Sequence, residues 1–378
     1  MIRLENLSKT FDSPEGTVRA VDNVTMEVPE GEVAVLLGPS GCGKTTTMKM
    51  VNRLVQPTSG KIYIDDKDTD SYDAIQLRRQ LGYVIQQIGL FPNMTVEQNI
   101  SVVPRLLGWS RQAQQTRARE LMRMVALDER LLSRFPKELS GGQQQRVGVA
   151  RALAADPPVL LMDEPFGAID PINREVIQDE FLKMQAKLKK TIMFVSHDID
   201  EAVKMGDKIA IFRDGRLEQY DDPDMLLSQP ANPFIADFVG GDRELKRMRL
   251  TRVSAAMDPD APTVQADDSV ANARAIMDQA GRAHAVVVDA ANRPMGLLTD
   301  RQLDGEPGRL CRDAANPLPE PVTADRDLRT AVSSMFTHDV DWMPVVDADG
   351  CFAGVVTQDG IRGVLAESRR RPARQGAA

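Results

Sequence analysis

Apolar residues in the first 240 positions occur as short continuous runs separated by longer segments with helical spacing. Short apolar runs are typical of parallel strands that are buried on both faces. Core strands are expected at Val33–Leu37, Val159–Met162, Ile192–Val195 and Ile209–Phe212. Shorter, half-exposed strands are expected at Ile2–Leu7, Val24–Val28 and Lys61–Asp65. The pattern predicts an α/β domain over residues 1–240, with a parallel core sheet and an antiparallel β subdomain.

Helical spacing dominates one insertion between the two halves of this sheet domain. Thr95 and Gln98 have the spacing of a capping box and predict a helix that runs towards residue 107. A second helix is expected from about 111 to 126, where apolar residues recur on one face. We therefore predict a helical subdomain over about 87–140.

The last third of the chain contains an internal repeat. A shift of 58 residues superposes the Val-Val-Asp-Ala sequence at 287–290 on 345–348, and it takes Thr299 to Thr357. Each unit reads as an extended start, an amphipathic helix, a Val-rich strand, a second strand and a final helix. Repeats of this size normally pair to bury a shared face. Glycines followed by alternating charge indicate a linker at 241–251.

Charge and cysteine usage narrow the classes of function. The formal net charge of −8 argues against a general nucleic-acid binder. The three cysteines have no metal or redox spacing, which is typical of reduced thiols in a cytoplasmic protein. The N-terminus lacks the apolar core of a signal peptide, and no apolar run approaches the length that spans a bilayer. Any association with a membrane is therefore expected to come through a partner.

A glycine-rich loop lies between the expected strand at 33–37 and a helix-forming segment. Its residues are Gly38, Pro39, Ser40, Gly41, Cys42, Gly43, Lys44 and Thr45, in the pattern G-x-x-x-x-G-K-[ST]. This order of strand, loop and helix predicts a phosphate-binding loop whose backbone N–H groups face an anion. Lys44 is expected to reach the β- and γ-phosphates, and the Thr45 hydroxyl to bind the Mg²⁺ that they carry.

Polar residues follow two of the expected core strands and a further strand at 83–85. Asp163 is placed to hold the water shell of a Mg²⁺ ion, and Glu164 to act as a general base or to orient an attacking water. His197 stands at a carboxyl strand end, where open α/β sheets bind ligands, and is expected to contact the γ-phosphate. Gln86 follows a strand at 83–85, and the neighbouring Gln87 is the alternative residue at this position.

A second candidate anion site begins at Ser140. Ser140 is a favourable helix N-cap, and Gly141 and Gly142 would leave the first-turn N–H groups of the following helix uncovered. An ordinary capped helix start is the alternative. The phosphate-binding loop upstream favours the functional interpretation.

In order and spacing, these motifs resemble the ATP-binding cassette of ABC transporters over residues 1–240. The resemblance implies that Gln86 is the Q-loop glutamine, which reaches Mg²⁺ or the attacking water. It implies that Glu164 is the catalytic base, that Asp163 binds the metal with Thr45, and that His197 is the switch histidine.

The same resemblance implies further contacts with ATP. The signature residues Ser140, Gly141, Gly142 and Gln143 would cover the nucleotide held by a second copy of the chain, in a head-to-tail dimer. The remaining contacts would come from Thr46, from Asp170 of the D-loop, and from Phe11. Phe11 stands at the A-loop position, where an aromatic ring stacks on adenine, and a core or surface role is its alternative.

The repeated units resemble a tandem of CBS domains at 252–309 and 310–366, followed by a basic tail at 367–378. Such pairs bind adenine nucleotides or cyclic dinucleotides, or respond to ionic strength. Ligand-binding members tend to carry an Asp three residues after the Thr, whereas Gln302 and Gly360 stand there in this chain. A regulatory ligand site and a structural or dimerising module therefore both remain open.

A cassette joined to tandem CBS domains is similar to the ATPases of importers for osmoprotectants such as glycine betaine, choline and carnitine. This resemblance implies an ATPase that uses ATP and Mg²⁺ at the cytoplasmic face of the inner membrane. Its partners would be an integral membrane permease and, indirectly, an extracytoplasmic substrate-binding protein. The alternatives are an importer ATPase for another small solute, a soluble ABC ATPase acting on ribosomes or DNA, and a nucleotide sensor with an incidental ATPase.

Overall fold

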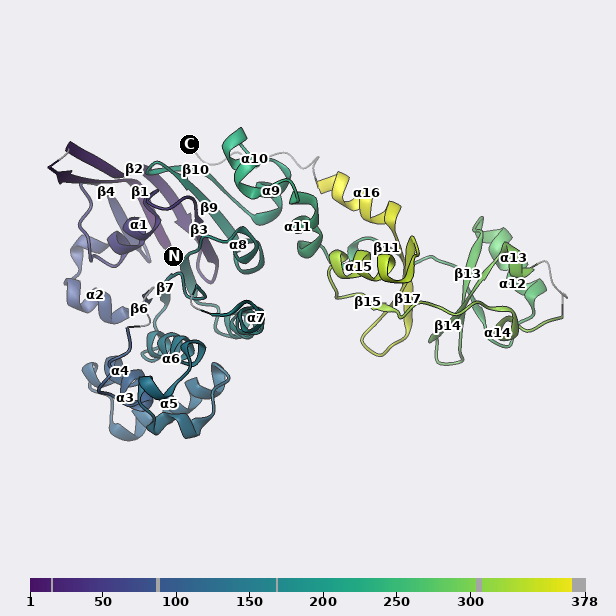
Figure 1. The fold of residues 1–378 in the computed structure, drawn as a ribbon, viewed down its shortest axis with the longest axis horizontal. Coiled ribbons are helices and arrows are strands. Elements are labelled where there is room, and N and C mark those ends of the chain that lie inside the picture. The colour runs from purple at the N-terminus through teal and green to yellow at the C-terminus, as the bar shows by residue number, and fades with distance from the viewer. Residues whose placement is uncertain (15, 86–88, 168, 304–307, 369–378) are drawn as a thin grey trace. The chain divides into compact units, whose positions relative to one another are not determined.

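The computed structural model describes residues 1–14, 16–85, 89–167, 169–303 and 308–368 (Figure 1). The chain divides into two compact units. The first comprises Met1–Leu226 and Pro230–Val239, and the second comprises Leu227–Gln229 and the chain from Gly240 onwards. None of the described helices has the length and apolarity needed to cross a membrane.

A six-stranded sheet forms the centre of the first unit, in the order β10-β9-β3-β8-β7-β6. Its strands are β3 (Val33–Leu37), β6 (Leu81–Val84), β7 (Val159–Asp163), β8 (Thr191–Val195), β9 (Lys208–Arg213) and β10 (Arg216–Asp221). Neighbouring strands are parallel except for β9 and β10, and β3, β7 and β8 are buried along their whole length. The predicted parallel core sheet is confirmed. The carboxyl ends of β3, β7 and β8 therefore meet at one edge.

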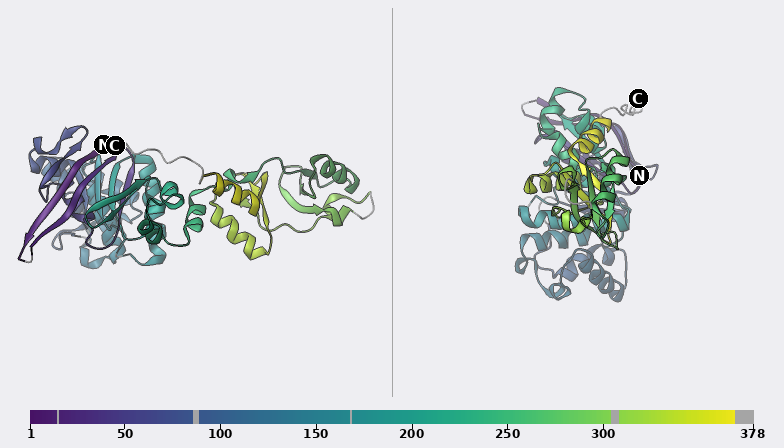
Figure 2. Two further views of the ribbon diagram at one scale, coloured as in Figure 1. Left: turned by 90° about the horizontal axis from the view of Figure 1, so that it is seen from above. Right: turned by 90° about the vertical axis from the view of Figure 1, so that its right-hand side faces the viewer.

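A second, antiparallel sheet has the order β2-β1-β4-β5, which confirms the predicted β subdomain. Its strands are β1 (Ile2–Ser13), β2 (Gly16–Val28), β4 (Ser59–Ile64) and β5 (Lys67–Asp68). β1 and β2 extend beyond their expected bounds because their ladder continues through polar residues to the pair Ser13–Gly16. Figure 2 shows these two strands, in purple, as a long hairpin.

Helices surround the sheets of the first unit (Figure 1). They are α1 (Lys44–Val51), α2 (Ala74–Gln80), α3 (Val96–Ile100), α4 (Val102–Leu106), α5 (Arg111–Met124), α6 (Gly141–Leu153), α7 (Pro171–Leu188), α8 (Ile199–Met205), α9 (Pro223–Ser228) and α10 (Pro233–Val239), with 3-10 turns at Thr69–Ser71, Glu129–Ser133 and Pro136–Glu138. The predicted capping box of Thr95 and Gln98 begins α3. The single helix expected towards residue 107 is instead two helices that meet at Ser101. Pro104 explains the break, because it lacks the N–H that would donate to the carbonyl of Ile100.

The second unit reproduces the repeat seen in the sequence. Its first half contains α11 (Arg243–Leu250), a 3-10 turn (Val253–Ala255), β11 (Met257–Asp258), β12 (Thr263–Gln265), α12 (Val270–Ala280), β13 (His284–Val288), β14 (Pro294–Thr299) and α13 (Asp300–Leu303). Its second half contains α14 (Cys311–Ala314), β15 (Val322–Thr323), α15 (Leu328–His338), β16 (Trp342–Val346), β17 (Phe352–Thr357) and α16 (Gln358–Ser368). The bounds of α12, β13 and β14 recur 58 residues later in α15, β16 and β17.

The two repeats bury a shared apolar face, as their sequence pattern predicts. Val286 and Val288 of β13 pack with Val355 of β17, and Leu297 and Trp342 cover this cluster. Each repeat also has its own core. The pairing therefore adds a third apolar cluster that neither repeat could bury alone.

The segment 241–251, interpreted from sequence as a linker, forms helix α11 within the second unit. The helix contacts α15 and α16. Arg247 is fully buried there, where it pairs with Glu244 at 2.8 Å and donates to the carbonyl of Leu365 at 3.2 Å. The alternating charges of this segment predict an exposed linker, because charged side chains are rarely buried unless they have partners. The sequence does not show those partners.

Candidate functional site

The loop between β3 and α1 is held so closely that two of its positions accept only glycine. Gly38 has φ 144°, and a Cβ there would lie 2.2 Å from the carbonyl oxygen of Phe212. Gly43 has φ 102°, and its Cβ would lie 2.3 Å from the carbonyl oxygen of Ala20. The loop is therefore fixed between β9 and β2, with its backbone wrapped at the start of α1. Such a cradle fits a phosphate, since N–H groups and the helix dipole converge on it.

We expect Gly38→Ala to lower the free energy of unfolding by about 1–3 kcal/mol more than Gly41→Ala does. Both glycines have positive φ, but a Cβ at Gly41 has open space around it, whereas one at Gly38 meets backbone. Chemical unfolding of the two variants measures the difference. Equal losses would show that backbone conformation alone, and not the contact with Phe212, requires glycine.

Lys44 begins α1 and is buried beneath the loop. Its Nζ donates to the carbonyl oxygens of Gly38 at 2.7 Å and Pro39 at 2.9 Å. The ammonium is thus held against the backbone of the loop, where it can reach the oxygen of a bound phosphate as a point charge.

Thr45 and Asp163 bring together two oxygen ligands from α1 and β7. Thr45 Oγ1 lies 3.1 Å from Asp163 Oδ1. Burial raises the pKa of the Asp163 carboxyl, although its hydrogen bond with Thr45 acts in the opposite direction. A cation would stabilise the ionised form of this carboxyl, so the pair fits a divalent ion that takes its remaining ligands from phosphate and water. Within the described part of the chain, no cluster of three His, Cys, Asp or Glu side chains could hold a metal unaided.

Glu164 and His197 lie against each other at the carboxyl ends of β7 and β8. Nε2 of His197 contacts Oε1 of Glu164, and the Glu164 N–H donates to the carbonyl of Val195 at 3.0 Å. Glu164 has φ 47°, which is unfavourable for a residue with a side chain and often marks a functional site. The imidazole is half exposed while the carboxyl is mostly buried, so solvent reaches the pair from the side of His197.

Ser140, at the start of α6, forms a capping box with Gln143. The Gln143 N–H donates to Ser140 Oγ at 3.3 Å, and the Ser140 N–H donates to Gln143 Oε1 at 2.9 Å. Apart from the backbone of α6 itself and the adjoining residues, no heavy atom of the described chain lies within 4 Å of a Cβ built at Gly141 or Gly142. The first turn of α6 is therefore open to a ligand or to another molecule.

Of three other predicted site residues, the structure describes Phe11 and Asp170 but not Gln86. Phe11 is 42% exposed on β1 and pairs with Val18, close to the part of β2 that contacts Gly43. Asp170 is exposed at the start of α7, where its carbonyl accepts the Arg174 N–H at 2.9 Å. Gln86, together with Gln87, lies outside the described residues.

Glu201 is a supporting residue that the sequence did not single out. It is buried on α8, accepts a hydrogen bond from the Ser196 hydroxyl, and accepts another from Gln178 Nε2 at 3.0 Å. Burial raises the pKa of its carboxyl. Glu201 thereby fixes the residue before His197 to α7. A glutamate four residues after the histidine, next to the apolar pair Ala202 and Val203, was the signal that could have identified it.

The structure thus gathers Lys44, Thr45, Asp163, Glu164 and His197 at one sheet edge. These five side chains come from β3–α1, β7 and β8, which are widely separated in sequence. The first turn of α6, by contrast, forms its hydrogen bonds with its own capping residues. The arrangement can bind a polyphosphate with a divalent cation and place a carboxylate beside it.

Comparison with known proteins gives matches over both units. The family model described as ABC transporter matches residues 21–167, and the CBS domain model matches 253–305 and 312–367. The osmoprotectant import ATP-binding protein OsmV of Salmonella typhimurium is 55% identical over 377 residues, covering 99% of this chain and 98% of that protein. The glycine betaine/carnitine/choline transport ATP-binding protein OpuCA of Bacillus subtilis is 43% identical over 371 residues, covering 97% of each.

A solved structure matches the first unit. It is the dimeric post-hydrolysis state of the ATP-binding cassette MJ0796 bound to ADP and Pi. The sequence identity is 37% and the TM-score is 0.54, with 59% of this chain and 98% of that chain covered.

Proposed function

Because the chain belongs to the family of ATP-binding subunits of osmoprotectant ABC importers, we propose that it energises the uptake of quaternary-amine solutes of the glycine betaine, choline or carnitine type. As a member of this family it is an ATPase and binds ATP. One observation carries the choice of solute class. The similarity to osmoprotectant relatives extends over the cassette and the CBS pair together.

The site supports a division of roles among its residues. Lys44 would bind the β- and γ-phosphates, and Thr45 and Asp163 would hold Mg²⁺. Gln86, with Gln87 as its alternative, lies outside the described residues and keeps the role near the metal that its place in the sequence implies. Bound Mg²⁺ would neutralise phosphate charge. Glu164 orients the attacking water and takes its proton, while His197 holds the carboxylate through Nε2 and lies where it can contact the γ-phosphate.

A second copy of the chain completes the site in this proposal. The open first turn of α6, with Ser140, Gly141, Gly142 and Gln143, would cover the ATP bound by the partner copy. Asp170 at the start of α7 would lie at the same interface, and Phe11 would stack on adenine. The dimeric state of the related cassette MJ0796 supports this arrangement.

The permease would bind the helical side of the first unit, at the cytoplasmic face of the membrane. A groove of about 320 Å³ lies between α4 and β6, with Val102, Val103 and Tyr83 among its lining residues. Leu54, also in its lining, is 48% exposed. Arg78, Arg79 and Arg151 also line the groove, so it combines apolar surface with positive charge and is suited to an amphipathic helix of a membrane partner that carries acidic residues. That permease would receive solute from an extracytoplasmic substrate-binding protein.

The CBS pair would regulate the ATPase, with an adenine nucleotide or a cyclic dinucleotide as the candidate signal. The residues three positions after Thr299 and Thr357 have local roles here. Gln302 accepts a hydrogen bond from the Thr299 hydroxyl at 2.5 Å, and the Gly360 N–H donates to Thr357 Oγ1 at 3.0 Å. A Cβ at Gly360 would lie 2.7 Å from the carbonyl of Ala256, so the aspartate of ligand-binding relatives does not fit there. Any nucleotide would therefore be bound without that carboxylate.

Uptake by the reconstituted complex of ATPase, permease and binding protein tests the solute class. We expect ATP-dependent accumulation of labelled betaine, choline or carnitine, with a rate that changes across a salt series. Labelled histidine and maltose serve as control solutes. Uptake of none of the three quaternary amines would contradict the osmoprotectant proposal while leaving the ATPase intact. A salt response that persists after removal of the chain beyond residue 251 would contradict a role of the CBS pair in that salt response.

A further inference from the structure

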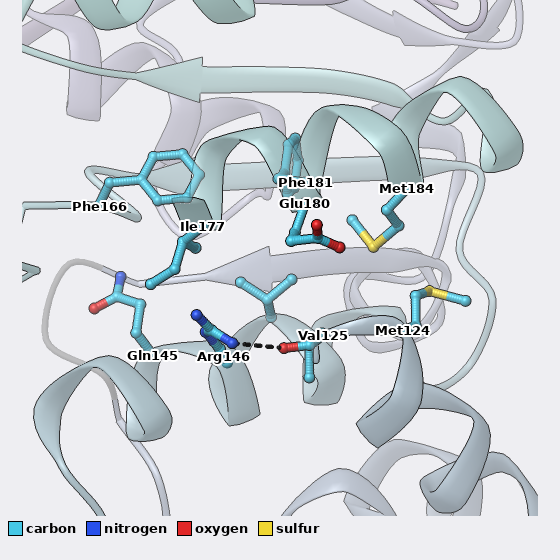
Figure 3. Close-up of a pocket in the computed structure, with 10 residues that line it drawn as sticks. Met124, Val125, Gln145, Arg146, Phe166, Ile177, Glu180, Phe181 and Met184 are labelled. Carbon is cyan, nitrogen blue, oxygen red and sulfur yellow. Dashed lines mark hydrogen bonds between the residues drawn. The ribbon is translucent and has the colours of Figure 1, made fainter. Parts of the chain in front are cut away.

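Gln145 joins the helix that carries the signature to the turn that follows the catalytic glutamate. It lies on α6, two residues after Gln143, and is 3% exposed. Its Nε2 donates to the carbonyl oxygen of Pro165, the residue directly after Glu164. Figure 3 shows Gln145 directed from α6 towards Phe166 and Ile177.

The surroundings of Gln145 leave its amide little choice of partner. Its Oε1 is buried and has no hydrogen-bond partner among the described residues. The neighbouring cavity is only about 30 Å³ and is lined largely by apolar side chains such as Phe166, Ile177 and Phe181. Keeping a buried amide oxygen unpartnered is costly. The hydrogen bond from Nε2 to the Pro165 carbonyl is therefore the interaction that offsets the cost of burying this amide.

Pro165 lies in the turn that sets the backbone of Glu164. The Gly167 N–H donates to the carbonyl of Glu164 at 3.1 Å, and Gln145 holds the next carbonyl. Glu164 is kept at φ 47° within this turn. A strained backbone persists only where its surroundings hold it, and these two hydrogen bonds do so.

The helix itself is tied to the helical subdomain. Arg146 Nη1 donates to the carbonyls of Val125 at 3.3 Å and Ala126 at 3.0 Å, at the end of α5 (Figure 3). A movement of α5 and α6 therefore carries Gln145 with it. Pro165, on the other side of the hydrogen bond, belongs to the loop after a core strand.

We propose that Gln145 is a positioning residue, which holds Glu164 of its own chain through the Pro165 carbonyl and so links the signature helix to hydrolysis. The inference rests on the proposed function, in which the signature covers the partner's ATP while Glu164 acts on the ATP of its own chain. When the signature of one copy engages, Gln145 would adjust the glutamate of that same copy. The two ATP sites of a dimer would thereby be coupled through a single chain.

Gln145→Met tests the proposal, because methionine keeps the volume but cannot donate. We expect the full-length variant to bind ATP as the parent does and to lose about tenfold in kcat. Gln144→Met is the matched control. Gln144 donates to the Leu139 carbonyl at 3.2 Å, within its own helix start, and this hydrogen bond does not involve the Glu164 turn, so parental kcat is expected. Parental kcat for Gln145→Met would overturn the proposal.

Mixed dimers of differently tagged copies show where Gln145 acts. In one dimer, Gln145→Met lies in the copy with intact Glu164, and the other copy carries Glu164→Gln. In the second dimer, one copy carries both substitutions and the other copy is unchanged. We expect the first dimer to be about tenfold slower.

Each other outcome overturns the proposal. Equal rates would assign Gln145 a merely structural role, and a slower second dimer would mean that it acts through the signature on the partner's ATP. A parent protein without ATPase activity would instead contradict the proposed function itself.

Discussion

Replacing Glu164 by glutamine is expected to stop ATP turnover while leaving ATP binding intact. The substitution keeps the shape of the side chain but removes the carboxylate that we propose takes a proton from the attacking water. General-base catalysis contributes typically about 10²–10⁴-fold, so kcat should fall at least a hundredfold. Without hydrolysis, two copies should remain closed over their ATP, and size-exclusion chromatography with ATP should show a dimer.

The loss of turnover is expected to be specific to Glu164 because of how its neighbours hold its carboxylate. His197 Nε2 contacts the carboxylate, and the backbone at φ 47° directs the side chain from the end of β7. Glu30→Gln, at an exposed turn position between β2 and β3, is the matched control and should keep the parental rate. Hydrolysis by Glu164→Gln at the parental rate would falsify the assignment of the base.

Removing the ammonium of Lys44 is expected to weaken nucleotide binding strongly. Hydrogen bonds that involve a charged group contribute about 1.5–3 kcal/mol each, so Lys44→Ala should weaken ATP binding by about 10- to 100-fold or more. Binding of a fluorescent ATP analogue measures the loss directly. Because Lys44 also donates to the carbonyls of Gly38 and Pro39, its removal leaves two backbone acceptors without this partner and should lower Tm as well.

Lys49 provides a control on the same helix. It is exposed on α1, five residues after Lys44, and its charge acts on Asp163, so Lys49→Ala removes a nearby positive charge but keeps the ammonium that donates to the Gly38 and Pro39 carbonyls. We expect near-parental ATP affinity for this variant. A comparable loss in both variants would mean that net positive charge, rather than the buried ammonium beneath the loop, determines binding.

Much of the site could be predicted because its parts are local in sequence. A phosphate loop needs glycine where φ is positive and a lysine at the helix start, and Gly38, Gly43 and Lys44 lie within seven consecutive residues. Capping boxes at Thr95 and Ser140 are also local, since each involves residues three positions apart. These features follow from steric and hydrogen-bonding rules that act over one or two turns of chain.

Other features depend on packing between distant segments and could not be predicted. The expected helix towards residue 107 is divided, β1 and β2 continue through polar residues, and 241–251 forms a packed helix with a buried Arg247. Burial of an arginine depends on partners such as Leu365, which lies more than one hundred residues away. Periodicity along the chain carries no information about such partners.

By itself, the sequence determined the class of ligand, the parallel core, the repeat and the candidate residues of the site. The tertiary structure decided which of those residues meet, namely Thr45 with Asp163, Glu164 with His197, and Gln145 with the carbonyl of Pro165. The physical reason is one of range. Backbone sterics and capping act between near neighbours, whereas these pairs form only after strand order and helix packing have brought separate segments to one sheet edge.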